Sequence, residues 1–313
     1  MSHVKRSKIE VETKISVVIP CHNCDQWIGE ALDSVLAQTL SAFEVVIVLD
    51  RCSDESRRVI ERHALDATIL ETNFGNAAAA RNAGVDVCSG IQIAFLDADD
   101  WWESDHLNRA ASLMADSGDV AYFGHWMEYF SDMKETRQIK PLNISSDQAG
   151  LTSERWYEEY VESIGWPTSG MVVSRERFLE VGGFDETQLR RHDTEMFARV
   201  VHSKTWSYSP KPCFFYRRSV AGSISSNKPE CRYYKILSDQ KIASHYGKDL
   251  RTDRSLRAAR SCVSTAIKAR DPELLQRCFA IAGPLLSPWR KCLYRLTWRF
   301  CGLGAPLLRL LDK

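Results

Sequence analysis

Continuous apolar runs alternate with helical patterns in the N-terminal third of this chain. Apolar runs cover Ile15–Pro20, Phe43–Leu49 and Ile91–Leu96, and their continuous apolar character predicts strands that are buried on both faces. Thr68–Glu71 is predicted as a further, short strand. Polar or glycine-containing loops lead from them into predicted helices over 27–36, 57–63 and part of 73–90. Strands that alternate with helices imply right-handed crossovers. The pattern therefore predicts an α/β fold with a Rossmann-like, mostly parallel sheet flanked by helices.

The last of these apolar runs ends in three carboxylates, Asp97, Asp99 and Asp100. Open α/β sheets bind ligands at the carboxyl ends of their strands, so these side chains are expected to emerge together in a binding site. Clustered like charges are unfavourable unless a cation or hydrogen-bond donors compensate them, and hard oxygen ligands suit Mg²⁺ or Mn²⁺ bound to a diphosphate. A solvated acidic turn is the alternative, because short acidic motifs also match by chance.

An ordered set of motifs surrounds this cluster: VVIPCHN, VLDRCSD, NFGNAAAARNAG, FLDADDWW, GMVVSRERFLEVGGFDE, RRHDTEMFARV and PCFFYRRSVAGSIS. In this order they resemble the family 2 glycosyltransferases with the GT-A fold, over about Ile15 to Ser225. The resemblance implies transfer of a sugar, with inversion, from a nucleotide-diphosphate donor to an acceptor. It also implies a catalytic domain over 15–225, between an N-terminal extension (1–14) and a C-terminal helical region (226–313).

The resemblance assigns donor contacts to five residues, namely Pro20, His22, Asp50, Arg81 and Asp97. The aspartate matching Asp50 contacts the nucleotide base or ribose, and the arginine matching Arg81 lies along the nucleotide. Asp97 matches the residue that holds ribose and metal, and Asp99 matches the principal ligand of the Mn²⁺ or Mg²⁺ ion. The family's Asp-Asp-Gly-Ser is here Leu49-Asp50-Arg51-Cys52, which retains only Asp50.

A single displacement at a sugar carbon needs a base that takes the proton of the acceptor hydroxyl. Asp193 matches the acidic residue that has this role in the family. It also opens a helical pattern, so the alternative is a carboxylate that only stabilises a helix N-terminus. The family's Glu-Asp is here His192-Asp193, and the imidazole is a second candidate for the base or for acceptor binding.

Three other side chains are candidates for acceptor or diphosphate contacts. Trp101 and Trp102 follow the acidic cluster and are suited to stack on a sugar, although at least one is expected to pack beneath the loop. Arg217 precedes a Gly- and Ser-rich stretch that either closes over a diphosphate or forms an ordinary surface loop.

Composition places the protein in the cytoplasm. Ten cysteines are scattered without a disulfide framework, which favours a reducing compartment. Cys21, His22 and Cys24 lack a second ligand pair at suitable spacing, so we expect no zinc site. The basic N-terminus is not followed by the apolar run of a signal peptide, and no segment is long enough for a spanning helix.

The C-terminal region is strongly basic. Residues 251–313 contain thirteen Lys and Arg against four Asp and Glu, a net charge of +9, and because the chain is neutral, residues 1–250 carry −9. Helices are expected over Arg254–Lys268 and Glu273–Ala282. Trp289–Leu311 mixes aromatic and basic residues, which predicts peripheral contact with anionic lipid on the inner face of the membrane. Docking on the catalytic domain or on a second copy of the chain is an equal alternative, and nucleic acid is not expected.

The sequence thus predicts a metal-dependent, inverting glycosyltransferase of polysaccharide biosynthesis. On family grounds its donor is a UDP-sugar, and its acceptor is a glycan, a lipid-linked sugar or another hydroxyl compound. Two alternatives keep an α/β sheet with acidic residues: a non-catalytic nucleotide-sugar or glycan binder, and a nucleotidyltransferase, which releases pyrophosphate instead of a nucleoside diphosphate. Tyr122–Ser146 is not placed and forms either extra strands or a mobile loop.

Overall fold

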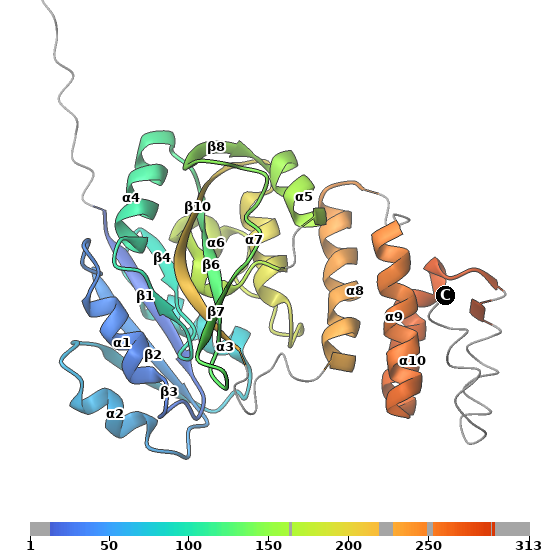
Figure 1. Ribbon diagram of the computed structural model, residues 1–313, viewed down its shortest axis with the longest axis horizontal. Coiled ribbons are helices and arrows are strands. Elements are labelled where there is room, and N and C mark those ends of the chain that lie inside the picture. Colours follow the sequence, from blue (N-terminus) through green and yellow to red (C-terminus); the bar gives the residue numbers. More distant parts are fainter. Residues whose placement is uncertain (1–12, 163–164, 219–227, 249–252, 289, 292–313) are drawn as a thin grey trace, which may run out of the picture.

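The computed structural model describes residues 13–162, 165–218, 228–248, 253–288 and 290–291. Helices flank a central sheet, and the helices that follow residue 228 stand to one side of it (Figure 1). The expected N-terminal extension and the segment Trp289–Leu311 fall almost entirely outside the described residues, so the structure bears on neither.

The N-terminal half of the sheet is parallel. It contains β1 (Ile15–Cys21), β2 (Glu44–Asp50), β3 (Thr68–Thr72) and β4 (Gln92–Phe95) in the order β3-β2-β1-β4. Each strand lies within two residues of the segment that predicted it. β1 and β2 bury nearly every side chain, which explains why their sequences do not alternate.

Three helices connect these strands: α1 (Ile28–Leu36), α2 (Ser56–Arg62) and α3 (Ala77–Val87). The side chain of Asn76 caps α3 by accepting a hydrogen bond of 2.9 Å from the amide of Ala78. Gly84 lets α3 approach the sheet, because a Cβ at this position would lie 2.6 Å from Cγ1 of Val18.

Beyond β4 the sheet is mixed, which the sequence did not indicate. It continues with β9 (Met171–Ser174), β6 (Ala121–Phe130), β10 (Thr205–Arg218) and β5 (Trp101–Trp102). β9 runs antiparallel to both of its neighbours, whereas β6 and β10 are parallel to each other. β7 (Glu135–Gln138) pairs antiparallel with β6, and β8 (Gln148–Thr152) pairs antiparallel with β10. The unplaced stretch therefore contains strands, namely most of β6 and all of β7.

The remaining helices are α4 (His106–Ser117), α5 (Ser153–Glu162), α6 (Arg175–Glu180), α7 (His192–Val201), α8 (Lys228–His245), α9 (Asp253–Ala269) and α10 (Pro272–Ala282). Short 3-10 turns cover Thr168–Gly170 and Gly283–Leu285. The two predicted C-terminal helices are confirmed as α9 and α10, and the predicted α/β sheet with a helical C-terminal region is present.

The C-terminal helices dock on the sheet domain through α8. Ile242 of α8 belongs to the main hydrophobic core, whereas Ile236 of the same helix joins α9 and α10 in a second core. The hydroxyl of Tyr246 donates to the carbonyl of Ala198 in α7 at 3.2 Å. Within the described part of the chain, no helix is long and apolar enough to cross a membrane.

Candidate active site

The acidic loop after β4 is held by its last carboxylate. Oxygen atoms of Asp97, Asp99 and Asp100 lie within 4.8 Å of one another. Asp100 is buried, and it accepts hydrogen bonds from Oγ of Ser169 at 2.6 Å and from the backbone amide of Arg217 at 2.9 Å. Both of its oxygens therefore hold the loop to the protein, and Asp97 and Asp99, which are less buried, are the principal ligand candidates.

The negative charge of this loop is only partly compensated at Asp99, by the nearby Arg217 and Arg81. Burial and the neighbouring Asp97 raise the pKa of Asp99 to about 6, and burial followed by Asp99 and Asp97 raises the pKa of Asp100 well above its ordinary value. Among the described residues, no other residue donates a hydrogen bond to the carboxylate of Asp99. Crowded, desolvated oxygens of this kind fit a hard divalent cation such as Mg²⁺ or Mn²⁺, which would be held by Asp99 and Asp97.

Arg217 braces the acidic loop from β10. Its Nε donates to the carbonyl of Asp99 at 2.8 Å, and its Nη2 forms an ion pair with Glu30 of α1. The guanidinium also lies 4.5 Å and 4.7 Å from the ring centroids of Trp27 and Trp101. Arg217 is thus a buried side chain that links three segments around the loop.

The two tryptophans of the loop differ in exposure. Trp102 is buried, and its Nε1 donates to the carbonyl of Ser169 at 2.7 Å, so it packs beneath the loop as expected for at least one of them. Trp101 is half-buried and stacks on Phe215 with 4.8 Å between ring centroids.

Asp50 ends β2 and organises the loop after β3. Its carboxylate accepts hydrogen bonds from the amides of Phe74 at 2.6 Å and Asn76 at 3.0 Å, and from the hydroxyl of Thr72 at 3.1 Å. Burial raises the pKa of Asp50, but hydrogen bonds from Gly75, Asn76, Phe74 and Thr72 outweigh it and hold that pKa below its ordinary value. The side chain is therefore an ionised anchor for residues 73–76.

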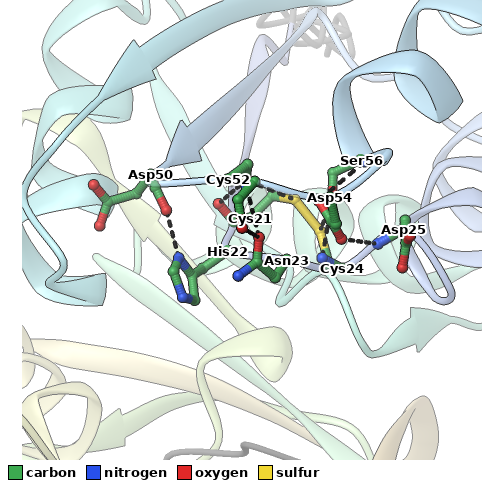
Figure 2. The surroundings of a disulfide bond; sticks show 10 residues. Cys21, His22, Asn23, Cys24, Asp25, Asp50, Cys52, Asp54 and Ser56 are labelled. Atoms are coloured by element: carbon green, nitrogen blue, oxygen red, sulfur yellow. Dashed lines mark hydrogen bonds between the residues drawn. A yellow bond between two sulfur atoms is a disulfide. The ribbon is translucent and has the colours of Figure 1, made fainter.

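His22 follows β1 and meets the end of β2 (Figure 2). Its Nδ1 donates to the carbonyl of Asp50 at 2.6 Å. Pro20 is the penultimate residue of β1 and lies in register with Val48. Because β2, β1 and β4 are adjacent and parallel, these residues and the acidic loop share one edge of the sheet.

Arg81 of α3 connects the acidic loop to the start of α7. One end of its guanidinium forms an ion pair with Asp97, and Nη1 donates to Nε2 of His192 at 2.8 Å. The Nδ1 of His192 faces the carbonyl of Gln188 at 3.2 Å, so this nitrogen carries the proton. Burial and then the charge of Arg81 lower the pKa of His192 to about 3, and the imidazole is neutral.

Asp193 lies in the first turn of α7, next to His192. Its Oδ1 accepts hydrogen bonds from the amide of Thr194 at 2.6 Å and from the Thr194 hydroxyl at 3.2 Å. The side chain is half-buried, with its second oxygen not engaged by any described residue. The contacts from Asp97 through Arg81 to His192 bring the N-terminus of α7 to the acidic loop.

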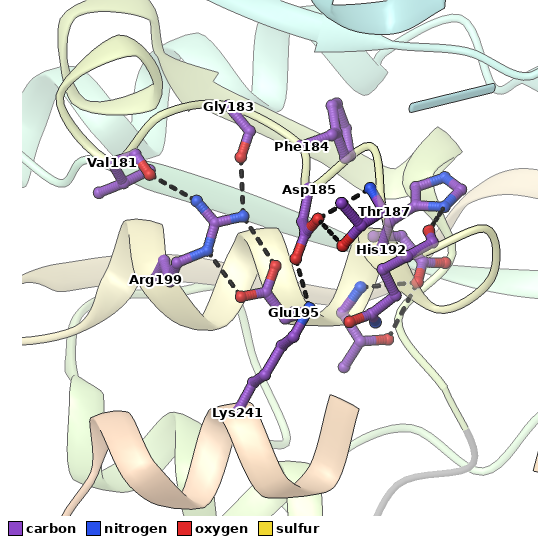
Figure 3. A network of polar contacts seen from close by, with 12 residues as sticks. Val181, Gly183, Phe184, Asp185, Thr187, His192, Glu195, Arg199 and Lys241 are labelled. Carbon is purple, nitrogen blue, oxygen red and sulfur yellow. Dashed lines mark hydrogen bonds and ion pairs between the residues drawn. The ribbon is translucent and has the colours of Figure 1, made fainter. Parts of the chain in front are cut away.

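A polar network fixes the turn that precedes α7 (Figure 3). Gly182 and Gly183 have φ of +82° and +65°, a conformation that glycine adopts without strain. Arg199 of α7 donates to the carbonyls of Val181 and Gly183 at 2.6 and 2.7 Å and forms an ion pair with Glu195. This network sets the position of α7 and hence of its first turn.

Asp185 in the same turn holds α8 through an ion pair with Lys241 (Figure 3). Burial raises its pKa, but Lys241 and Thr187 outweigh burial and lower it from 3.8 to about 2. The ionised carboxylate therefore adds stability above pH 4, and this stability is lost as the pH falls toward about 2. We expect Asp185→Asn to reduce the free energy of unfolding by about 1–2 kcal/mol at pH 7, with a smaller reduction at pH 3. Denaturant titrations at both pH values measure it, and an equal reduction at both would contradict the ion pair.

Several structural features of the site were not predicted. Ser169 and Glu30 contact the loop or its brace from distant segments, and nothing in their local sequence marks them. The expectation of unpaired cysteines is not met at Cys21 and Cys24, which form a disulfide. The Cys-x-x-Cys spacing of these two residues is the sequence feature from which the disulfide could have been predicted.

Comparison with known proteins shows the family of this chain. Residues 16–174 match Glycosyl transferase family 2, so the chain belongs to this family and the predicted resemblance is confirmed. An uncharacterized glycosyltransferase of Nostoc sp. is 30% identical over 236 residues, which are 71% of this chain and 65% of that protein. The amylovoran biosynthesis glycosyltransferase AmsB of Erwinia amylovora is 29% identical over 200 residues, covering 60% and 64%. The chain thus spans just under two thirds of each relative.

Solved structures agree on the fold. TarS 1-349 of S. aureus in complex with UDP-GlcNAc matches with a TM-score of 0.64 and 16% identity, covering 96% of this chain and 90% of TarS 1-349. TarS 1-349 in complex with UDP matches with a TM-score of 0.61. The predicted fold class is confirmed by this likeness.

Proposed function

We propose that this protein transfers a sugar, with inversion, from a UDP-sugar to a hydroxyl group of a glycan or lipid-linked acceptor. The observation that carries the proposal is the acidic loop at the carboxyl edge of the parallel strands, where Asp99 is desolvated, crowded by Asp97 and lacks a donor from any other described residue. Family membership supports the reaction type, and the nucleotides in the TarS complexes support the choice of UDP. Polysaccharide biosynthesis is the proposed context.

The proposed catalytic domain covers residues 15–225, with the docked helices in the C-terminal region 226–313. Asp97 and Asp99 would hold Mn²⁺ or Mg²⁺, which when bound neutralises charge on the diphosphate leaving group. Arg81, kept in place by His192, orients Asp97. Asp50 and His22 shape the pocket for the nucleoside through the loops that they anchor.

Proton transfer is assigned to Asp193. Its second oxygen is available to accept the proton of the acceptor hydroxyl, whereas both nitrogens of His192 are engaged. We therefore propose Asp193 as general base and His192 as a positioning residue. Trp101, half-buried beside the loop, is the proposed contact for a sugar ring.

A nucleotide-sugar screen tests the proposal. A UDP-sugar with Mn²⁺ should raise the melting temperature, because a ligand at about a hundred times its Kd stabilises by about 2.7 kcal/mol. Products from the stabilising donor should contain UDP, whereas release of pyrophosphate would indicate a nucleotidyltransferase. Absence of a metal-dependent shift with every nucleotide-sugar would overturn the proposal.

A further inference from the structure

A disulfide and a free thiol lie together at the edge of the proposed donor pocket (Figure 2). Cys21, the last residue of β1, is bonded to Cys24. The Sγ of Cys52, in the loop after β2, lies 4.0 Å from the Sγ of Cys21 and donates to the Cys21 carbonyl at 3.3 Å. Cys21 and Cys24 are buried, and Cys52 is half-buried. A third sulfur is therefore within reach of the disulfide.

The short loop closed by this disulfide grips the segment that follows β2. Each residue from 22 to 25 makes at least one contact with this segment. His22 Nδ1 donates to the Asp50 carbonyl at 2.6 Å, and the Ser53 amide donates to Asn23 Oδ1 at 2.8 Å. The Cys24 amide donates to Ser56 Oγ at 2.9 Å, and the Asp25 amide donates to Asp54 Oδ2 at 3.0 Å. Asn23 has φ of +51°, a conformation that costs energy outside glycine. A covalent ring helps to hold this backbone in place.

We propose that Cys21, Cys24 and Cys52 form a thiol–disulfide exchange site in which one disulfide moves between the Cys21–Cys24 and Cys21–Cys52 pairings. In the exchange, the Cys52 thiolate attacks Sγ of Cys21, a Cys21–Cys52 bond forms and the Cys21–Cys24 bond breaks. Cys24 leaves as a thiolate and takes up the proton that Cys52 lost. One disulfide and one thiol are present before and after, so the exchange consumes no oxidant or reductant.

The pairing controls the shape of the donor pocket. Bonding Cys21 to Cys52 opens the ring that contains His22 and Asn23, and it ties the end of β1 directly to the loop after β2. The hydrogen bonds of His22 with Asp50 and of Asn23 with Ser53 are then no longer held in place by the disulfide ring. We therefore assign the higher affinity for UDP to the Cys21–Cys24 form, an assignment that rests on the proposed function.

The environment of Cys52 keeps the exchange slow. Burial, and after it the negative charge of Asp54, raises the pKa of the Cys52 thiol. Because the thiolate is the attacking species, only a small fraction of the protein is able to exchange at neutral pH. A slow exchange is consistent with the presence of the Cys52 thiol beside the Cys21–Cys24 disulfide.

Trapping the alternative pairing tests the exchange. Full-length parent, Cys24→Ser and Cys88→Ser are equilibrated with reduced and oxidised glutathione, quenched in acid, alkylated and mapped by peptide mass spectrometry. Cys24→Ser should contain a Cys21–Cys52 bond. Cys88→Ser, which changes a buried cysteine of α3's C-terminus, should keep the parent's Cys21–Cys24 bond. Recovery of Cys21 and Cys52 as separate thiols or separate glutathione adducts in Cys24→Ser would overturn the exchange.

A second measurement uses the parent protein, in which Cys21, Cys24 and Cys52 are all present. On incubation with a maleimide, the parent should accumulate molecules labelled at Cys24 that contain the Cys21–Cys52 bond, whereas Cys52→Ser should accumulate none. Absence of molecules labelled at Cys24 from the parent at every maleimide concentration, including concentrations at which Cys52 is labelled slowly, would also overturn the exchange. This measurement does not depend on whether Cys24→Ser folds.

UDP titrations test the effect on the pocket. Oxidised Cys24→Ser should bind UDP with Mn²⁺ about tenfold more weakly than the oxidised parent, because the pocket is less well organised before binding. Equal affinity of the two proteins for UDP would refute the inference that the pairing controls the donor site. The peptide maps would still decide whether the exchange occurs. If UDP bound to no form of the protein, the proposed function would fail, and the peptide maps would still decide the exchange.

Discussion

Asp99→Asn is expected to abolish sugar transfer and to remove the effect of Mn²⁺ on donor binding. The asparagine keeps the shape of the side chain but loses the charge that we assign to the cation. In EDTA, the variant and the parent should bind UDP alike. Folding should not suffer, because the pKa of about 6 shows that the ionised Asp99 is itself unfavourable in this buried cluster at neutral pH. Transfer rates, UDP titrations with Mn²⁺ or EDTA, and melting temperatures measure the three effects.

The matched control is Asp86→Asn, which removes the same charge from an exposed position on α3. It should leave transfer and metal-dependent binding close to those of the parent. UDP binding by the parent that is unaffected by EDTA would remove Asp99 from the ligand set. Transfer by Asp99→Asn within a few-fold of the parent rate would do so as well.

The parallel half of the fold was predictable mainly because β1, β2 and β4 are buried on both faces, whereas β3 at the edge is partly exposed. In β1 and β2, almost every side chain enters the core, so the sequence must be continuously apolar. Polar loops and helical spacing between the runs then identify the crossovers. The predicted strands and helices up to β4 consequently lie within a few residues of the observed ones.

The mixed half was not predictable from local pattern. β9 is four residues long and lies between β4 and β6, although 75 residues separate its start from the end of β4. The direction of β9 is set by its pairing with β4 and β6, because a short apolar run has the same sequence pattern in a parallel and in an antiparallel strand. β10 pairs with β6 through two register shifts near Pro212, a residue that weakens any strand pattern.

In the candidate site, too, some features follow from the local sequence and others depend on residues that are distant in the sequence. The position of the three carboxylates followed from the strand that precedes them, but their different environments did not. Asp100 is anchored by Ser169 and Arg217, which lie 69 and 117 residues away in the sequence. Asp99 is adjacent to Asp100, but its carboxylate contacts neither residue, and Arg217 binds only its backbone carbonyl. The two residues are thus alike in sequence and differ only through tertiary structure.

His192 and Asp193 are also adjacent residues whose surroundings differ. The imidazole is buried, neutral and engaged at both nitrogens, and the Asp193 carboxylate is half-buried with one oxygen on Thr194. We therefore expect His192→Ala to act through donor binding, because Arg81 loses the acceptor that holds it beside Asp97. The KM for the donor should rise, while the rate at saturating donor falls less than in an Asp193 variant.

Asp193→Asn is expected to lower transfer by about 10²- to 10⁴-fold at saturating donor while leaving UDP affinity close to that of the parent. The amide keeps the hydrogen bonds from Thr194 but lacks the basicity needed to accept the proton of the acceptor hydroxyl. If Asp193 only stabilises the start of α7, the variant should instead lose about 1 kcal/mol of stability or less and retain transfer within a few-fold. Transfer rates and melting temperatures of Asp193→Asn and His192→Ala, measured together, distinguish these roles. Near-parental transfer by Asp193→Asn would exclude Asp193 as the base, and a large loss of the saturated rate in His192→Ala alone would move that role to the imidazole.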